Sequence, residues 1–315
     1  MIKPRTVKYL KVFLIASIVF LGLLELHLRF FWGFGDAVLM QSDKDLEYLA
    51  QPNQNRFRFR SHIFINSFSM RSAEPDSTAF KILGLGDSVM YGGAIIDQDS
   101  LMTTLMSEKL TATFNRKIQL LNVAMGSWGP DNCYAYLKKY GDFNAKLILL
   151  VVSSHDAFDN MDFRRVVDHD PGYESKQYKV AIWELINRYA LPRLFPNKKK
   201  KEEAIPGVKK KSNHFNSGFQ HIYQYAQNKN IPLVLYLHAD TIELRNQEYN
   251  IMGKQILEFC NERDIKCVSG FDGFTRNDYR DIIHLKESGQ RKLTEQLFPV
   301  IKQVISEEIK KSSAK

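Results

Sequence analysis

Two distant segments carry residues that could together perform nucleophilic chemistry. Ser88 follows an apolar run in "FKILGLGDSVMYGG" and has glycines on both sides, where the main chain can approach a ligand closely. Asp281 and His284 lie three residues apart in "DIIHLKESG", so on one turn their side chains can share a face. A serine nucleophile needs a base to take its proton and an acid to orient that base. Asp281 and His284 could supply both functions to Ser88.

A third segment, "SSHDAFDN", places His155 beside Asp156 directly after the apolar run "AKLILLVV". The pair suggests a catalytic base with its acid. However, adjacent residues of a strand point to opposite faces, so such neighbours rarely orient one another. We therefore expect His155 to have a different role from that of His284.

Apolar strands and amphipathic helices alternate along the chain and must position these residues. Strands are predicted at 80–86, 118–125, 145–154, 231–239 and 265–271, and helices at 100–114, 131–141, 213–227, 248–262 and 286–309. Continuous apolar strands separated by helices indicate a parallel sheet covered on both faces. The predicted fold class is therefore α/β, with three layers. The carboxyl ends of parallel strands share one edge, where Ser88, Gly126 and His155 should meet.

The N-terminal segment predicts a membrane anchor. Residues 1–11 carry four basic and no acidic side chains, and residues 12–24 are uncharged. Thirteen such residues suit the core of a signal peptide, whereas a spanning helix needs about 20. No small-residue cleavage site follows, and Glu25 and Arg29 are spaced to pair. We predict an uncleaved signal anchor over residues 1–34, with its basic end in the cytoplasm; a cleaved signal or a buried helix is the alternative.

The net charge of +9 is confined to two segments. Residues 1–11 carry +4 and residues 198–211 carry +5, so the rest of the chain is neutral overall. A nucleic-acid binder would spread basic residues over a folded face, so we expect no nucleic-acid partner. The three cysteines form no CxxC pair and no zinc spacing with histidine, so no metal or cofactor is predicted. Cys260 and Cys267 could form a disulfide outside the cytoplasm or remain thiols.

Between the anchor and the first strand of the sheet, residues 35–79 read as a linker and a β-rich prelude. Within it, "RFRFRSHIFINS" alternates charged and apolar residues, which predicts a strand or hairpin with solvated arginines. Residues 80–315 form the predicted catalytic domain, interrupted by an insertion at about 160–211. The insertion contains an amphipathic helix, "AIWELINRYALPRLF", and then a lysine-rich loop.

These segments together resemble the SGNH, or GDSL, hydrolase family. Ser88 in "GDS" matches the nucleophile block, Gly126 in "NVAMGSWG" the glycine block, and "DIIH" the terminal block. The segment "INSFSMR" is similar to an element of membrane-anchored members, and the resemblance spans 52–297 in the family's order. It implies a flavodoxin-like fold in which Ser88, Asp281 and His284 are catalytic and the amides of Ser88 and Gly126 bind the oxyanion.

One block departs from the family pattern. Relatives carry G-N-D-x-x-D-N where this chain has "SHDAFDN", so His155 stands at the position of the oxyanion-binding asparagine. An imidazole can donate an N–H, so His155 could still serve the oxyanion hole. The alternative is a weakened hole.

The resemblance implies a serine-dependent esterase or acyltransferase. Anchored, outward-facing members often act on acyl groups of polysaccharides, so we expect an O-acetyl esterase or O-acetyltransferase for extracytoplasmic carbohydrate. A membrane-bound partner could supply the acyl group. One alternative is a lipid esterase, favoured if the insertion helix forms an apolar lid. The other is a catalytically impaired binding or assembly protein in polysaccharide export.

Overall fold

The computed structural model describes residues 4–195, 210 and 212–313, and in this part of the chain five strands form one parallel sheet. The strands are β5 (Phe80–Gly86), β6 (Ile118–Ala124), β7 (Leu147–Ser153), β8 (Leu233–His238) and β9 (Lys266–Ser269). Their order is β6-β5-β7-β8-β9, which is the flavodoxin-like order 2-1-3-4-5. The predicted α/β class is confirmed.

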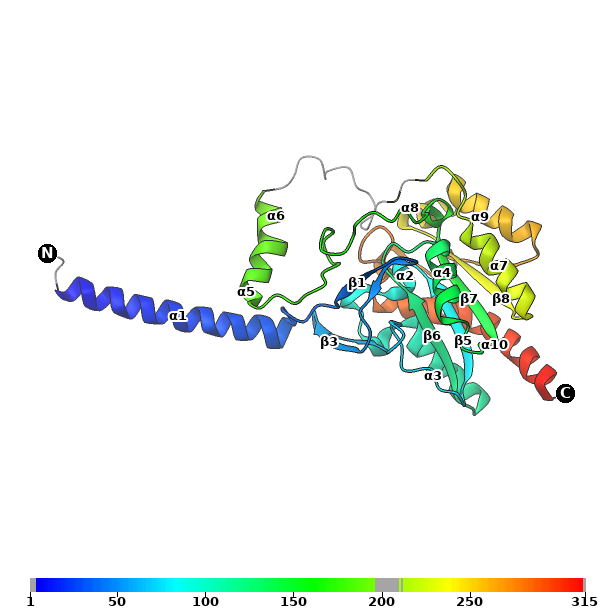
Figure 1. Ribbon diagram of the computed structural model, residues 1–315, viewed down its shortest axis with the longest axis horizontal. Helices are drawn as coiled ribbons and strands as arrows, with labels where there is room; N and C mark the ends of the chain where they lie inside the picture. The colour runs from blue at the N-terminus through cyan, green and yellow to red at the C-terminus, as the bar shows by residue number, and fades with distance from the viewer. Residues whose placement is uncertain (1–3, 196–209, 211, 314–315) are drawn as a thin grey trace.

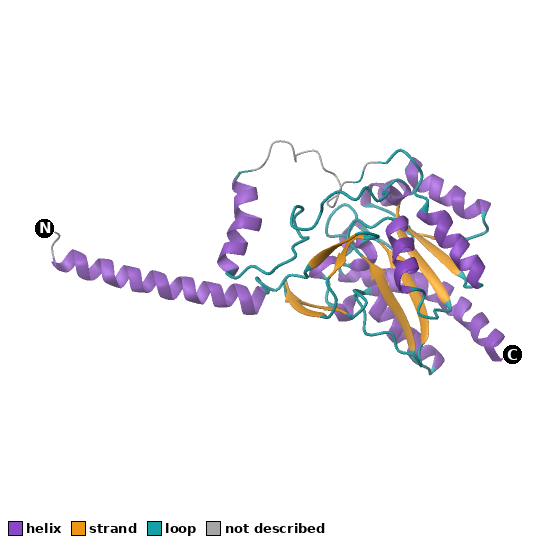
Figure 2. Ribbon diagram, in the orientation of Figure 1, coloured by secondary structure: helices purple, strands orange, loops and turns teal. Residues whose placement is uncertain are grey.

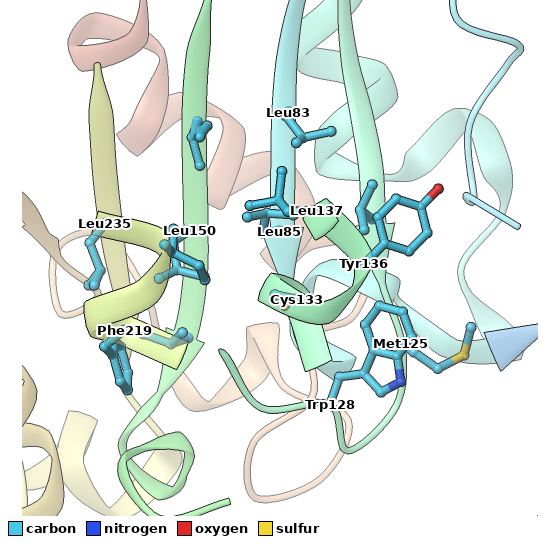
Figure 3. Close-up of a cluster of buried hydrophobic side chains, with 14 of the residues drawn as sticks. Leu83, Leu85, Met125, Trp128, Cys133, Tyr136, Leu137, Leu150, Phe219 and Leu235 are labelled. Atoms are coloured by element: carbon cyan, nitrogen blue, oxygen red, sulfur yellow. The ribbon is translucent and has the colours of Figure 1, made fainter. Parts of the chain in front are cut away.

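Helices cover both faces of the sheet (Figure 1). One face packs against α4 (Pro130–Tyr140), α7 (Gly218–Lys229) and α9 (Ile251–Glu262), and the other against α3 (Met102–Phe114) and α10 (Glu287–Ser313). Successive strand residues alternate between the two cores because strand side chains alternate in direction: Leu83 and Leu85 lie in the first core, and Ile82 in the second. Figure 3 shows the first core, where Cys133 and Leu137 of α4 and Phe219 of α7 meet the strands.

Two hairpins precede the sheet in the described chain (Figure 2). Strand β1 (Met40–Asp43) pairs with β2 (Glu47–Ala50), and β3 (Gln54–Arg58) pairs with β4 (Ser61–Ile65). The predicted hairpin is therefore present, but the prediction that its arginines are solvated is wrong for Arg58. Its side chain is 2% exposed and donates to Glu184 at 2.5 Å, because the insertion covers this strand.

Helix α1 (Pro4–Trp32) projects from the domain (Figure 1). Its apolar side chains are largely exposed. It is long and apolar enough to cross a membrane, and no other helix of the described residues passes the same test. Glu25 and Arg29 form the expected ion pair at 2.7 Å.

The insertion contains a continuous helical run, made of α5 (Ala181–Glu184), a π-helical segment (Leu185–Ala190) and α6 (Leu191–Leu194). Most of the predicted lysine-rich loop lies outside the described residues. Lys210 is described, and its buried ammonium lies 3.0 Å from Glu47.

The remaining elements are short. They are α2 (Ser88–Tyr91), α8 (Thr241–Asn246) and the 3-10 turns Gly93–Ile95, Gln98–Ser100, Ser154–Ala157 and Arg276–Asp278. Cys133, Cys260 and Cys267 carry free thiols.

Candidate active site

Ser88 is the first residue of α2, directly after the carboxyl end of β5. The Asp87 carboxylate caps this helix by accepting the N–H of Val89 at 2.8 Å, and it also accepts the hydroxyl of Ser153 at 2.9 Å. Asp87 thus ties the turn that carries Ser88 to the end of the neighbouring strand β7.

The side chains of Ser88, His284 and Asp281 form a chain of hydrogen bonds. His284 Nε2 lies 2.9 Å from Ser88 Oγ, and His284 Nδ1 lies 2.8 Å from Asp281 Oδ2. The segment from Asp281 to His284 is a bend rather than a helical turn. Asp281 folds it, because its other oxygen accepts the N–H groups of Ile283 and His284 at 3.0 and 2.8 Å.

The environment keeps Asp281 ionised. Burial opposes its charge, but hydrogen bonds from the His284 ring and from the N–H groups of His284 and Ile283 outweigh burial and lower the pKa of Asp281 below its usual range. Arg280 adds a cation, with Nε 3.4 Å from Asp281 Oδ2. An ionised carboxylate at this position favours the His284 tautomer that carries its proton on Nδ1 and leaves Nε2 free to accept one.

His238 supports the same bend from beneath. It is fully buried at the end of β8, with Nε2 2.8 Å from the carbonyl oxygen of Ile283. This geometry makes Nε2–H the donor, so the neutral ring holds the main chain next to His284. Burial lowers the pKa of His238 to about 4.

Acid is therefore expected to weaken the fold through His238. Its pKa in the unfolded chain is about 6.5, so the unfolded state takes up the proton first. Stability should be unaffected above pH 6.5, fall between about pH 6.5 and 4, and have lost about 2 kcal/mol by pH 5. Denaturant unfolding at pH 7.5 and 5 measures the loss. His238→Asn should reduce the difference between the two pH values, and an unchanged difference would contradict this role.

Gly126 lies in the loop after β6, and two tyrosine hydroxyls hold its carbonyl oxygen. Tyr48 and Tyr173 each donate to it at 3.0 Å. Ser88, Gly126 and His284 line one cavity of about 290 Å³, whose wall also includes Tyr173 and Arg280. The structure thus brings the predicted residues Ser88, Gly126, Asp281 and His284 together at the carboxyl edge of the sheet.

His155 is placed differently. It lies in the 3-10 turn after β7 and is not among the described residues that line the Ser88 cavity. Its Nε2 is 3.6 Å from Asp159 Oδ2 and 3.8 Å from Asp156 Oδ1. Burial, with the nearby Asp87 and Asp159 carboxylates, raises the pKa of Asp156 well above its usual value. The proposed donor role of His155 stays a prediction.

Three solved hydrolase structures illustrate what the chain resembles. The first is a lipase/acylhydrolase from Enterococcus faecalis, with 12% identity, a TM-score of 0.42 and coverage of 71% of this chain and 95% of that one. The second is a member of the lipolytic protein G-D-S-L family from Veillonella parvula DSM 2008, with 10% identity, a TM-score of 0.40 and coverage of 70% and 98%. The third is a mutant acetyl-xylooligosaccharide esterase from Geobacillus Stearmophilus, with 12% identity, a TM-score of 0.41 and coverage of 70% and 94%.

The likeness is distant. No protein-family model matches the chain, and no curated protein matches it. At such identities and TM-scores, the activity and the catalytic residues have to be inferred from the geometry of the site.

Asp87, His155 and Asp156 could in principle ligate a metal, since each offers an atom within 4.8 Å of the others. However, both oxygens of Asp87 already accept hydrogen bonds, from Val89 and Ser153, and the His155 ring also faces Asp159. The neighbouring Val89, Ser153 and Asp159 thus supply partners for Asp87 and His155 without a metal.

Removing the Tyr173 hydroxyl is expected to slow catalysis modestly. Tyr173→Phe deletes one of the two hydrogen bonds on the Gly126 carbonyl, which is worth about 1 kcal/mol and corresponds to a fivefold to tenfold loss in kcat. Tyr225→Phe is the matched control, because that hydroxyl donates to Asp142 at 2.9 Å, away from the cavity. Steady-state kinetics on one ester measures kcat for both variants. Equal kcat values would contradict the proposed role of the Tyr173 hydroxyl.

Two substitutions at His155 test the donor role. We expect His155→Asn to keep or raise activity, because an asparagine amide also donates an N–H. On the predicted donor role, His155→Ala lowers kcat by about 10²-fold, since the loss of one oxyanion donor has that effect. Thermal unfolding of both variants separates a catalytic loss from a folding loss. If both variants retain full activity, His155 takes no part in the reaction.

Sequence reasoning missed the supporting residues Tyr48, Tyr173 and Arg188. Tyr173 belongs to the insertion but precedes its predicted helix, so no periodic pattern indicates its contact with the sheet edge. Arg188 lies in the predicted helix, whose amphipathic pattern does not show which residues the helix contacts. Arg280 directly precedes Asp281 in "YRDIIH", and this proximity is a signal that could have identified it.

Proposed function

We propose that the chain is a serine-dependent ester hydrolase or acyltransferase. The observation that supports it is the hydrogen-bonded chain from Ser88 through His284 to Asp281, at 2.9 and 2.8 Å, on the wall of a cavity. Such a chain is the arrangement that a serine needs to become a nucleophile. Its completeness argues against a purely binding or assembly role.

In the proposed reaction, Ser88 Oγ attacks the carbonyl carbon of an ester while His284 Nε2 takes its proton. The main-chain N–H groups of Ser88 and Gly126 stabilise the negative charge that develops on the carbonyl oxygen. His284 then gives its proton to the leaving alcohol, and an acyl-enzyme remains. Water, or the hydroxyl of a sugar, attacks this intermediate with His284 again acting as the base. Asp281 stabilises the imidazolium throughout.

An O-acylated carbohydrate is the proposed substrate class, with acetyl as the first acyl group to test. The cavity wall carries hydroxyls and guanidinium groups from Tyr91, Tyr173, Arg188 and Arg280, which can hydrogen-bond to sugar hydroxyls. The lipid-esterase alternative required an apolar lid from the insertion helix. That helix contributes Arg188 and Tyr189 to the cavity, whereas Trp183 does not line it.

We further propose that α1 anchors the catalytic domain on the outer side of a membrane. The basic N-terminal end and the long apolar helix support this orientation. An acyltransferase in that place would need a membrane-bound partner that delivers the acyl group, whereas an esterase would need none.

The test uses the full chain in detergent, with three substrates: p-nitrophenyl acetate, an O-acetylated oligosaccharide and p-nitrophenyl palmitate. We expect release of acetate from the first two, dependent on Ser88, and little turnover of the palmitate. With an unacetylated oligosaccharide added, acetyl groups on that acceptor would identify a transferase. If no acetyl ester is cleaved or transferred in a Ser88-dependent way, the proposed activity is wrong.

A further inference from the structure

The insertion helix, Ala181–Leu194, packs on the C-terminal end of α1 rather than on the sheet. Leu28 of α1, Phe34 and Ala181 form a small buried cluster. The Glu25 carboxylate of α1 accepts the N–H groups of Ala181 and Ile182 at 2.8 and 2.9 Å, and so caps the insertion helix. These contacts fix the direction of the insertion helix relative to α1.

A buried ion pair attaches the same helix to the β-hairpin of the prelude. Arg58 and Glu184 are both nearly inaccessible to solvent and lie 2.5 Å apart, and Glu184 also accepts the N–H of Gly35 at 2.6 Å. Phe34 packs edge-on against Tyr189 with ring centroids 5.6 Å apart. The insertion helix is thus fixed both to α1 and to the hairpin of β3 and β4.

The opposite side of the insertion helix is apolar and exposed. Trp183, Ile186, Leu191 and Leu194 are exposed on this helix, with the exposed Asn187 among them, and Phe195 follows the helix end; Trp183 is 55% exposed and Leu194 is 70% exposed. Next to it, the end of α1 exposes Phe30, Phe31 and Trp32. Large exposed apolar side chains gathered in this way mark a surface that contacts a partner.

The position along α1 at which the insertion helix docks indicates that the partner is a membrane surface. About 20 helical residues cross the hydrocarbon core of a bilayer. A span beginning at Val12, after the last lysine of the N-terminal segment, therefore ends near Phe31. The insertion helix contacts Glu25 and Leu28 of α1 and Phe34 just after it, and α5 and α6 run across the direction of α1 beside its C-terminal end (Figure 1). An amphipathic helix at this level and in this direction matches one that lies in the plane of a membrane surface.

We propose that the insertion helix lies in the outer interface of the bilayer that α1 spans, with Trp183, Ile186 and Leu194 in the boundary between headgroups and acyl chains. The exposed cations Lys179 and Arg193 flank this face and can reach lipid phosphates. The inference rests on the proposed membrane anchor. Its consequence is that the reaction takes place at the membrane surface, because Arg188 and Tyr189 of the same helix line the Ser88 cavity.

The three tryptophans of the chain allow a direct test. Trp32 lies at the end of α1, Trp183 is on the exposed apolar face, and Trp128 is 2% exposed within the domain core. The full chain is reconstituted into phosphatidylcholine vesicles, either unmodified or brominated at shallow acyl positions, which quench nearby tryptophans. The variants are W32F, W183F and the double variant W32F/W183F, so that Trp128 remains in all three and serves as the internal control.

We expect bromolipid to quench Trp183 in W32F and to quench Trp32 in W183F. The double variant keeps only the buried Trp128 and should not be quenched. If W183F is quenched while W32F behaves like the double variant, the anchor stands and the interfacial position of the insertion helix is refuted. If W183F is not quenched either, α1 does not span the bilayer. In that case the proposed anchor fails first, and this inference fails with it.

Discussion

Ser88→Ala is expected to lower kcat for ester cleavage by roughly 10⁵-fold or more, because no other group in the proposed reaction can form the acyl-enzyme. Ser88 Oγ is the atom to which His284 Nε2 is hydrogen-bonded, and alanine leaves His284 without a proton to take. Turnover of p-nitrophenyl acetate by the full chain measures the loss. Ser306→Ala, on the exposed face of α10, is the matched control and should keep full activity.

The size of the residual activity also carries information. Rates above the uncatalysed reaction can persist without the nucleophile, because an oxyanion hole still stabilises attack by water. A loss of less than tenfold in Ser88→Ala would mean that another residue is the nucleophile, and the assignment of the site would be wrong.

Asp281→Asn is expected to lower kcat by about 10⁴-fold while leaving the fold intact. An asparagine amide can donate to Nδ1, which favours the tautomer with the proton on Nε2, and that tautomer cannot accept the Ser88 proton. The carboxylate oxygen that folds the bend becomes an amide oxygen, so the N–H groups of Ile283 and His284 keep an acceptor. Steady-state kinetics measures the effect, with the exposed Asp272→Asn as the control.

The pH dependence of the activity lost in Asp281→Asn gives a second check on Asp281. Because hydrogen bonds lower its pKa below the usual range, Asp281 stays ionised throughout the mildly acidic range. The deficit of Asp281→Asn should therefore be similar at pH 6 and pH 8. A loss of less than tenfold at both values would show that another group orients His284.

The sheet was predictable because β5, β6, β7 and β8 are almost fully buried. Runs such as "FKILGLG" and "AKLILLVV" are continuously apolar, and the structure places β5 at Phe80–Gly86, where the sequence predicts a strand. Once these strands are parallel, the sheet edge brings Ser88 and Gly126 together. Asp281 and His284 were predictable as a pair because they are neighbours in sequence.

The residues that support the site depend on contacts between distant parts of the chain. Arg58 reads as a solvated strand residue, and only the docking of the insertion brings Glu184 to it, 126 residues away. Tyr48 and Tyr173 meet at the Gly126 carbonyl from the prelude and the insertion. His238 follows a buried strand in sequence, but its bond to Ile283 depends on how the C-terminal bend returns to the sheet. No periodic pattern encodes such contacts.

Covalent labelling of the nucleophile tests the central claim most directly. An alkyl fluorophosphonate forms a bond between phosphorus and an activated serine oxygen and releases fluoride, and peptide mass spectrometry locates the adduct. In the native full chain we predict a single adduct on Ser88, formed much more slowly in Asp281→Asn and absent in Ser88→Ala. A native chain that leaves Ser88 unmodified, or carries the adduct on another serine, would contradict the assignment of Ser88, His284 and Asp281 as the catalytic centre.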